Sequence, residues 1–133
     1  MNERDVIAAM LAAKTVAVVG LSADAGKPSH YVSAYLQQAG KRILPVNPAL
    51  EQVLGVESYP SLRDLPEKPD LVNVFRLPRA IPAIVDEMIE LGLDALWVQL
   101  GIRNEEAAAK AEAHGIRVVM DRCIMIDHRS MPR

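Results

Sequence analysis

The 133-residue chain carries 15 lysines and arginines against 17 acidic residues, a formal net charge of −2 at pH 7. This balance argues against nucleic acid as a partner, because nucleic-acid binding needs a basic surface. No apolar run approaches the roughly 18 residues of a membrane span, no signal-peptide pattern opens the chain, and the single cysteine excludes an internal disulfide framework. The length is typical of one domain, residues 1–133, which we expect in the cytoplasm.

Apolar spacing and turn residues predict alternating helices and strands. In chain order we expect a helix over 2–13, a strand over 15–20, a helix over 30–39, a strand over 43–46, a strand over 70–75, a helix over 79–91, a strand over 95–98, a helix over 105–114 and a strand over 116–120. The side chains of Asn2, Ser29 and Asn104 are placed to cap helix starts. Gly40 and Gly92 follow the expected ends of two helices.

The predicted strands are continuous apolar runs, VAVV, ILPV, LVNVF, ALWV and IRVVM. Such strands are buried on both faces, and the helices between them predict a parallel sheet. With right-handed crossovers, the expected architecture is α/β: a doubly wound, Rossmann-like, five-stranded sheet in a single domain, with strand order 3-2-1-4-5. Ligands bind such sheets at the carboxyl ends of the strands, here beside a switch point between strands one and four.

The stretch TVAVVGLSADAGKPS, residues 15–29, is the clearest functional signal. A strand that breaks at Gly20 and leads into a helix start leaves backbone N–H groups free for an anion, which predicts a phosphorylated cofactor. The loop departs from a P-loop, because five residues separate its two glycines and Pro28 follows Lys27 where a hydroxyl is needed. It also lacks the G-x-G-x-x-G pattern, and the second strand ends in Asn-Pro instead of the acidic residue that holds an NAD ribose.

Basic residues follow directly after the predicted strands: Lys27, Arg76, Arg79, Arg103 and Arg122. The same loops contain few acidic residues, chiefly Asp24 and Asp121. In a chain of negative net charge, this bias favours a multiply phosphorylated ligand. The alternative is a rim of solvated arginines at helix starts.

Seven segments, VAVVGLS, KPSHYVSAYL, PVNP, LGVESYPSL, NVFR, VQLGI and VMDRC, have the order and spacing of the small stand-alone coenzyme A (CoA)-binding proteins, which the chain resembles. These proteins are similar to the N-terminal CoA-binding domain of the succinyl-CoA synthetase α subunit and of ADP-forming acyl-CoA synthetases. The resemblance spans Thr15 to His128 and implies a Rossmann-like fold with CoA or acyl-CoA over the carboxyl edge. Two residues depart from the family pattern: Asn73 stands in place of Asp, and Met125 in place of a basic residue.

Carried over by position, the resemblance implies roles for individual residues. The pyrophosphate and 3′-phosphate region would be held by Gly20, Leu21, Ser22, Lys27, Pro28 and Ser29. The adenine or its ribose would contact Val46, Asn47 and Pro48, and the adenosine-diphosphate part would pass Phe75, Arg76 and Pro78. The pantetheine would be guided by Gln99, Gly101 and Ile102, with its thiol near Cys123.

The resemblance implies a binder rather than an enzyme. Related synthetases need a phosphohistidine-bearing domain and an ATP-grasp partner, for which 133 residues leave no room, and the chain shows no Ser-His-Asp or Cys-His spacing. We therefore expect binding of CoA or acyl-CoA without independent catalysis, and assign no catalytic residue and no metal ligand. Two alternatives stay open: an oxidoreductase or transferase using another, NAD-type nucleotide, and an accessory subunit of an acyl-CoA synthetase completed by an unknown protein partner. A homodimer is also open.

The sequence leaves two possible roles open for each of two side chains, Cys123 and His30. A lone cysteine after a buried strand is most often a small core residue, but Arg122 beside Cys123 would favour a reactive thiolate. His30, close to a helix start, is either a polar contact to the ligand or a solvated side chain.

Overall fold

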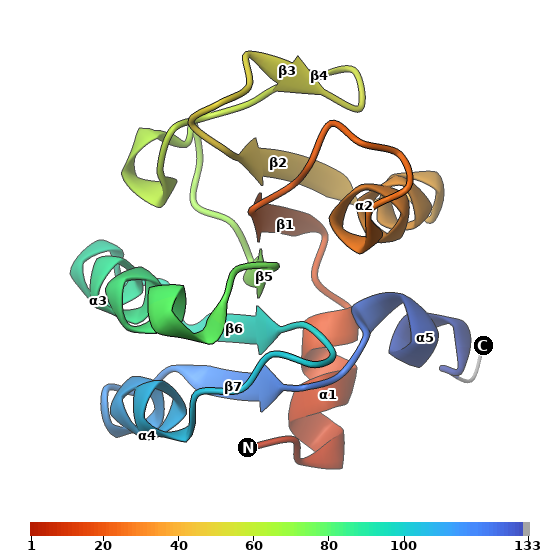
Figure 1. Ribbon diagram of the computed structural model, residues 1–133. Helices are drawn as coiled ribbons and strands as arrows, with labels where there is room; N and C mark the ends of the chain where they lie inside the picture. Colours follow the sequence, from red (N-terminus) through yellow and green to blue (C-terminus); the bar gives the residue numbers. More distant parts are fainter. Residues whose placement is uncertain (132–133) are drawn as a thin grey trace.

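Five parallel strands form the central sheet of the computed structural model, which describes residues 1–131 (Figure 1). They are β1 (Thr15–Val19), β2 (Arg42–Val46), β5 (Leu71–Val74), β6 (Ala95–Val98) and β7 (Arg117–Met120). All residues of β5 and β6 are buried, as is every residue after the first in the other three strands. The predicted α/β fold, with a parallel sheet covered on both faces, is confirmed.

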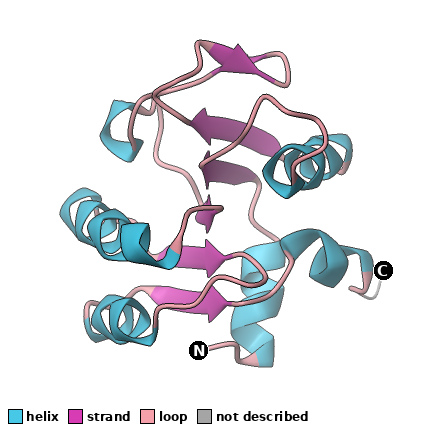
Figure 2. Ribbon diagram, viewed as in Figure 1, coloured by secondary structure: helices cyan, strands magenta, loops and turns pink. Residues whose placement is uncertain are grey.

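Helices form the two outer layers, which Figure 2 distinguishes from the strands by colour. One face of the sheet, on the left in Figure 1, carries α3 (Ile81–Leu91), α4 (Glu105–Ala113) and the short turn η1 (Leu62–Asp64). The other face carries α1 (Arg4–Leu11), α2 (Pro28–Gln38) and α5 (Ile124–Arg129). A second short turn, η2 (Pro78–Ala80), leads into α3. Within residues 1–131, no helix is long and apolar enough to cross a membrane.

Each face of the sheet has its own apolar core. Val74 and Met88 pack in the core under α3 and α4, whereas Leu36 and Trp97 pack in the core under α1, α2 and α5. Trp97 is fully buried, and its indole N–H donates to the carbonyl of Arg122 at 2.8 Å. This bond ties the middle of the sheet to the segment that precedes α5.

The helix ends follow the sequence prediction in part. Asn104 caps α4, since its Oδ1 accepts from the Ala107 N–H at 3.0 Å, and Gly92 ends α3 with a left-handed φ of 70°. The start of α2 was expected later: Lys27 is its N-cap and Pro28 its first residue. Proline suits that position because its fixed φ is helical and the missing N–H would have had no helical partner.

Asn2 lies beside β7 instead of capping α1, whose N-cap is Glu3. Its side-chain amide donates to the Met120 carbonyl at 2.9 Å and accepts from the Met120 N–H at 2.8 Å. Its backbone N–H donates to the Val118 carbonyl at 3.2 Å. Asn2 therefore supplies partners for polar groups on the outer edge of β7.

The strand order differs from the prediction. The sheet runs β2-β1-β5-β6-β7, so the five predicted strands lie in the order 2-1-3-4-5, and the expected order 3-2-1-4-5 is wrong. The outer edge of β2 pairs with Tyr59, whose N–H donates to the Pro45 carbonyl at 3.0 Å and whose carbonyl accepts from Asn47 at 2.9 Å. Pro45 has no N–H to offer on that side, and a proline of this kind is confined to edge strands.

The remaining chain between β2 and β5 forms a small hairpin of β3 (Gln52–Val53) and β4 (Val56–Glu57), followed by η1. The hairpin lies beyond β2, at the top of Figure 1. With that edge covered, the chain crosses back to place β5 on the other side of β1.

The new order moves the switch point to the gap between β1 and β5, and the expected position between strands one and four is corrected. The loops after these two strands consequently touch. A Cβ added to Gly20, which has φ of 90°, would lie 2.7 Å from the carbonyl oxygen of Phe75 and 2.9 Å from the Cδ of Arg76. Glycine is required there for both the backbone conformation and the close approach.

Candidate functional site

A pocket of about 510 Å³ opens at the carboxyl edge of the sheet, beside the β1–β5 switch point. We call it the edge pocket. The predicted site residues that line it are Gly20, Ser22, Lys27, Pro28, Ser29, Phe75, Gln99, Ile102 and Cys123. Its other lining residues are Tyr31, Val32, Leu100, Met125 and Ile126. Segments far apart in the sequence thus meet in one cavity: the loop after β1, the first turns of α2, the loop after β6 and the start of α5.

The loop between β1 and α2 is shaped by its own hydrogen bonds. The Ser22 N–H donates to Ser29 Oγ at 2.9 Å, and Ser22 Oγ accepts from the Asp24 N–H at 3.0 Å. Asp24 in turn accepts from the N–H of Gly26 at 2.9 Å and, through its carbonyl, from the N–H of Lys27 at 3.0 Å. This chain of bonds fixes the loop against α2 and leaves the Lys27 side chain exposed.

The start of α2 has groups available for an anion. The Ser29 N–H, in the first turn of this 11-residue helix, donates to no acceptor within residues 1–131. The side chains of Lys27, Arg76 and Arg79 have no carboxylate partner in the same part of the chain. Lys27, the N-cap of α2, and Arg76, whose Cδ lies beside Gly20, bring unpaired positive charge close to this helix N-terminus, whereas Arg79 lies in η2, outside the lining of the edge pocket.

Two of the five predicted basic residues are not available in this way. Arg103 pairs with Glu105 and Asp121, and Arg122 donates to Asp127 through Nε at 2.7 Å and Nη2 at 2.9 Å. The Asp127 hydrogen bond raises the pKa of Arg122. Because the charge of Arg122 is balanced by a carboxylate, the expected electrostatic activation of the neighbouring thiol loses its source.

Asp121 holds the loop after β6 in place. Its Oδ1 accepts from the Gly101 N–H at 2.7 Å and its Oδ2 from Arg103 at 3.1 Å. The bond from Gly101, and then that from Arg103, lowers the pKa of the Asp121 carboxyl group. The ionised carboxylate therefore fastens this wall of the edge pocket to the end of β7.

Gln99 is, with Ser29, one of the buried polar residues of the pocket wall. Its side chain is 4% exposed, and its Oε1 accepts from the Ile124 N–H at 3.0 Å, at the start of α5. Its amide Nε2 donates to no acceptor within residues 1–131. Because Nε2 is not among the buried polar atoms of the described residues that lack a partner, this donor reaches the surface of the pocket, where a ligand carbonyl could accept its hydrogen bond.

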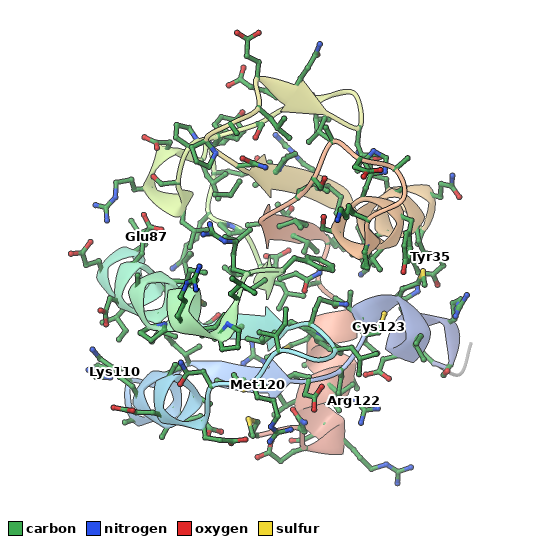
Figure 3. The ribbon with its side chains drawn as sticks, in the orientation of Figure 1. Tyr35, Glu87, Lys110, Met120, Arg122 and Cys123 are labelled. Carbon is green, nitrogen blue, oxygen red and sulfur yellow. The ribbon has the colours of Figure 1, made fainter. Side chains whose placement is uncertain are left out.

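The short helix α5 forms the remaining wall, with the partly buried Cys123 as its N-cap. Besides the bond to Gln99, α5 is held by a 2.7 Å hydrogen bond between Tyr35 Oη and His128 Nδ1. Figure 3 shows Tyr35 of α2 and Cys123 on the same side of the sheet. Cys123 therefore lies in a wall of the pocket that several contacts position.

Several predicted site residues lie outside the pocket lining. Leu21 and Val46 have buried side chains in the two cores, so a ligand could reach only their backbone. Asn47 is committed to protein contacts, donating to the Leu21 carbonyl at 3.0 Å and accepting from Ala49 at 2.9 Å. The exposed members of this group, around the same edge of the sheet, are Pro48, Arg76, Pro78 and Gly101.

The two departures from the family pattern differ in position. Asn73 is fully buried on the central strand β5, with no hydrogen-bond partner for its side-chain amide, whereas Met125 lines the edge pocket. His30 does not line the pocket. Among the described residues, no cluster of three or more histidine, cysteine or acidic side chains could hold a metal ion.

Sequence reasoning missed part of the apolar lining of the edge pocket. Tyr31 follows Lys27 by four residues, so the two lie on one face of α2, and this spacing is a signal that could have found it. Leu100 lies between two residues that were predicted. Met125 and Ile126 line the pocket because the chain turns into α5 directly after Cys123, a turn that no sequence pattern announced.

The doubly wound sheet and the pocket at its switch point define a Rossmann-like α/β protein. The chain belongs to the CoA binding domain family, which it matches over residues 14–129. The family resemblance predicted from the sequence is thereby confirmed.

Three similar proteins place the chain more closely. Protein YneT of Bacillus subtilis (strain 168) is 41% identical over 115 residues, covering 86% of this chain and 85% of that protein. A solved structure from Thermus thermophilus has a TM-score of 0.89 and 40% identity, and covers 97% of this chain and 98% of that one. The ADP-forming acetate–CoA ligase II of Archaeoglobus fulgidus is 32% identical over 117 residues, 79% of this chain but 17% of the ligase. The chain thus spans a small part of that ligase and nearly all of the Thermus protein.

Proposed function

We propose that this protein binds CoA or acyl-CoA along the edge pocket, without catalysing a reaction of its own. The observation that carries the proposal is the composition of one cavity. It joins the start of α2, with the unpaired cation Lys27, to a wall of apolar side chains with one unpaired amide donor, Gln99 Nε2. CoA has the matching parts, a phosphorylated nucleotide and a largely apolar arm with amide groups.

The phosphate groups belong at the switch point between β1 and β5. The Ser29 N–H would donate to the pyrophosphate, and Lys27 and Arg76 would pair with the pyrophosphate or the 3′-phosphate. Gly20 supports this placement, because its missing side chain lets the loop after β5 approach closely and brings Arg76 to the loop after β1. In the same pose, the adenine or its ribose would lie toward residues 46–48.

The pantetheine arm belongs along the loop after β6. Its amide carbonyl would accept the hydrogen bond that Gln99 Nε2 leaves unused, and Phe75 and Ile102 would cover its apolar atoms. The thiol end would then lie near Cys123, in the wall formed by α5. The residues of this chain bind and orient the ligand in this proposal, and its role is delivery, buffering or sensing of CoA.

The family match supports the ligand class. The Archaeoglobus relative is by name an acetate–CoA ligase, and the matched part is a small share of it. From that relative we carry over the recognition of CoA and not the ligase reaction. The end of β2 argues against an NAD-type ligand, because Asn47 is bound to Leu21 and Ala49 and offers no free carboxylate for a ribose.

The test is a comparison of ligands by thermal unfolding. A ligand that binds only the folded state raises the melting temperature in proportion to about RT ln(1 + [L]/Kd), so CoA should stabilise the protein more than equal concentrations of NAD, NADP or ATP. Lys27→Ala should reduce the CoA effect, whereas Lys68→Ala removes an exposed lysine before β5, outside the edge pocket, and should not. Greater stabilisation by NAD than by CoA would refute the proposal.

A further inference from the structure

The large apolar side chains that remain exposed are concentrated at the edge pocket. Within residues 1–131 they are Tyr31 (46% exposed), Leu77 (58%), Leu100 (60%) and Ile126 (46%). All except Leu77 line the edge pocket. Single exposed apolar residues are ordinary, but a group around one cavity marks a surface that a ligand or partner covers.

These three residues, which we call the apolar rim, come from three separate elements. Tyr31 lies in the first turns of α2, Leu100 in the loop after β6 and Ile126 in α5. Leu100 and Ile126, together with Cys123, also line a smaller pocket of about 190 Å³. The rim is thus continuous with the wall where the proposed pose leaves the sulfur of CoA.

The same two pockets limit how far the apolar surface extends. Beyond Leu100 and Ile126, the smaller pocket is lined by Asp121, Arg122 and Asp127, whose charges are paired with protein groups. A methylene chain covering the rim would lie on apolar atoms, whereas a longer one would have to desolvate these ion pairs.

We propose that the apolar rim holds the acyl group of an acyl-CoA, so that the protein prefers a short linear acyl thioester to free CoA. This inference rests on the proposed function. Free CoA ends in a thiol and has nothing with which to cover three half-exposed side chains. An acyl chain on the same sulfur continues directly onto them, and its burial is favourable in proportion to the apolar area covered.

Titration calorimetry with free CoA and with acetyl-, butyryl-, hexanoyl- and dodecanoyl-CoA tests this inference. Affinity should rise by about two- to fourfold per methylene over the short chains and stop rising before the dodecanoyl chain. Leu100→Ser and Ile126→Ser should bring the ratio of hexanoyl-CoA to CoA affinity close to one. Leu77→Ser is the matched control, because Leu77 is equally exposed but lies outside the pocket, and it should leave the ratio unchanged.

The outcomes separate this inference from the proposed function. Equal affinity for CoA and all thioesters would overturn the acyl preference and leave CoA binding intact, whereas no binding of any of them would overturn both. Sedimentation velocity on the same variants tests the alternative that a second protein molecule, and not an acyl chain, covers the apolar rim. If Leu100→Ser changes the oligomeric state while the ratio of affinities stays as in the unsubstituted protein, the rim is a protein interface and the inference is wrong.

Discussion

The basic residues at the carboxyl edge of the sheet fall into two groups with different surroundings. Near β1 and β5, Lys27 and Arg76 have no carboxylate partner in the described part of the chain. Near β6 and β7, Arg103 pairs with Asp121 and Arg122 pairs with Asp127. The comparison distinguishes cations that can pair with a negatively charged ligand from cations that hold the pocket wall together through ion pairs within the protein.

The largest effect on CoA affinity is expected when one arginine from each group is replaced and the two variants are compared. Arg76→Ala should weaken CoA binding by about ten- to a hundredfold, the loss of a charge-assisted hydrogen bond to phosphate. Arg103→Ala removes an exposed and already neutralised charge and should change the affinity by less than about threefold. Titration calorimetry of both variants measures the difference, and dephospho-CoA tells whether Arg76 faces the 3′-phosphate. Similar losses in the two variants would abolish the distinction between the groups.

A substitution at Gln99 should affect stability as well as binding. Gln99→Leu leaves the buried Ile124 N–H without its acceptor, and an unsatisfied group of this kind costs about 1–3 kcal/mol of the free energy of unfolding. The same change removes the donor proposed for the pantetheine, so CoA affinity should also fall. Urea unfolding measures the first effect, with Gln38→Leu on the exposed end of α2 as control. Unchanged stability would mean that α5 does not depend on Gln99.

The wall around Asp121 should depend on pH. The carboxylate form makes the bonds to Gly101 and Arg103, and they hold its folded pKa below the usual value of 3.8. The contribution of Asp121 to the free energy of unfolding is therefore fully present above pH 3.8. It is lost as the pH falls through the lowered pKa of the folded state. Asp121→Asn should flatten the decline of the urea midpoint in this acidic range. Identical pH profiles for the two proteins would show that the carboxylate does not act on stability.

Cys123 provides the smallest and most local test. CoA bound in the proposed pose covers this side chain, so saturating CoA should slow alkylation of the thiol by iodoacetamide, and NAD should not. Because the chain contains one cysteine, mass spectrometry of the intact protein measures the alkylation of Cys123 directly. An alkylation rate that CoA leaves unchanged would move the thiol end of the ligand away from α5.

Local chemistry explains which parts of the fold and site were predictable. The turn at Gly20, the cap at Asn104 and the buried strands depend on residues close together in the sequence, and the structure contains all of them. The strand order was missed although Pro45 carries a signal for it, since a proline with its carbonyl on the outer side marks an edge strand.

Long-range side-chain contacts around the site could not be predicted from the sequence for a different reason. Arg103 and Asp121 are separated by 18 positions, and the hydroxyl of Tyr35 and the ring of His128 by 93. Whether such groups meet depends on how β6, β7 and α5 are placed relative to one another. The sequence therefore identified the basic residues near the pocket but could not separate the paired from the unpaired ones.

Asn2 has a consequence for how copies of this protein can associate. A sheet edge with free backbone groups is a template on which another chain can form a further strand. Here Asn2 bonds to Val118 and Met120 on the outer side of β7, and Tyr59 bonds to Pro45 on the outer side of β2. Backbone groups on both outer edges of the sheet are thereby already bonded within the chain. Self-assembly of this protein through the outer edges of β2 and β7 is therefore disfavoured.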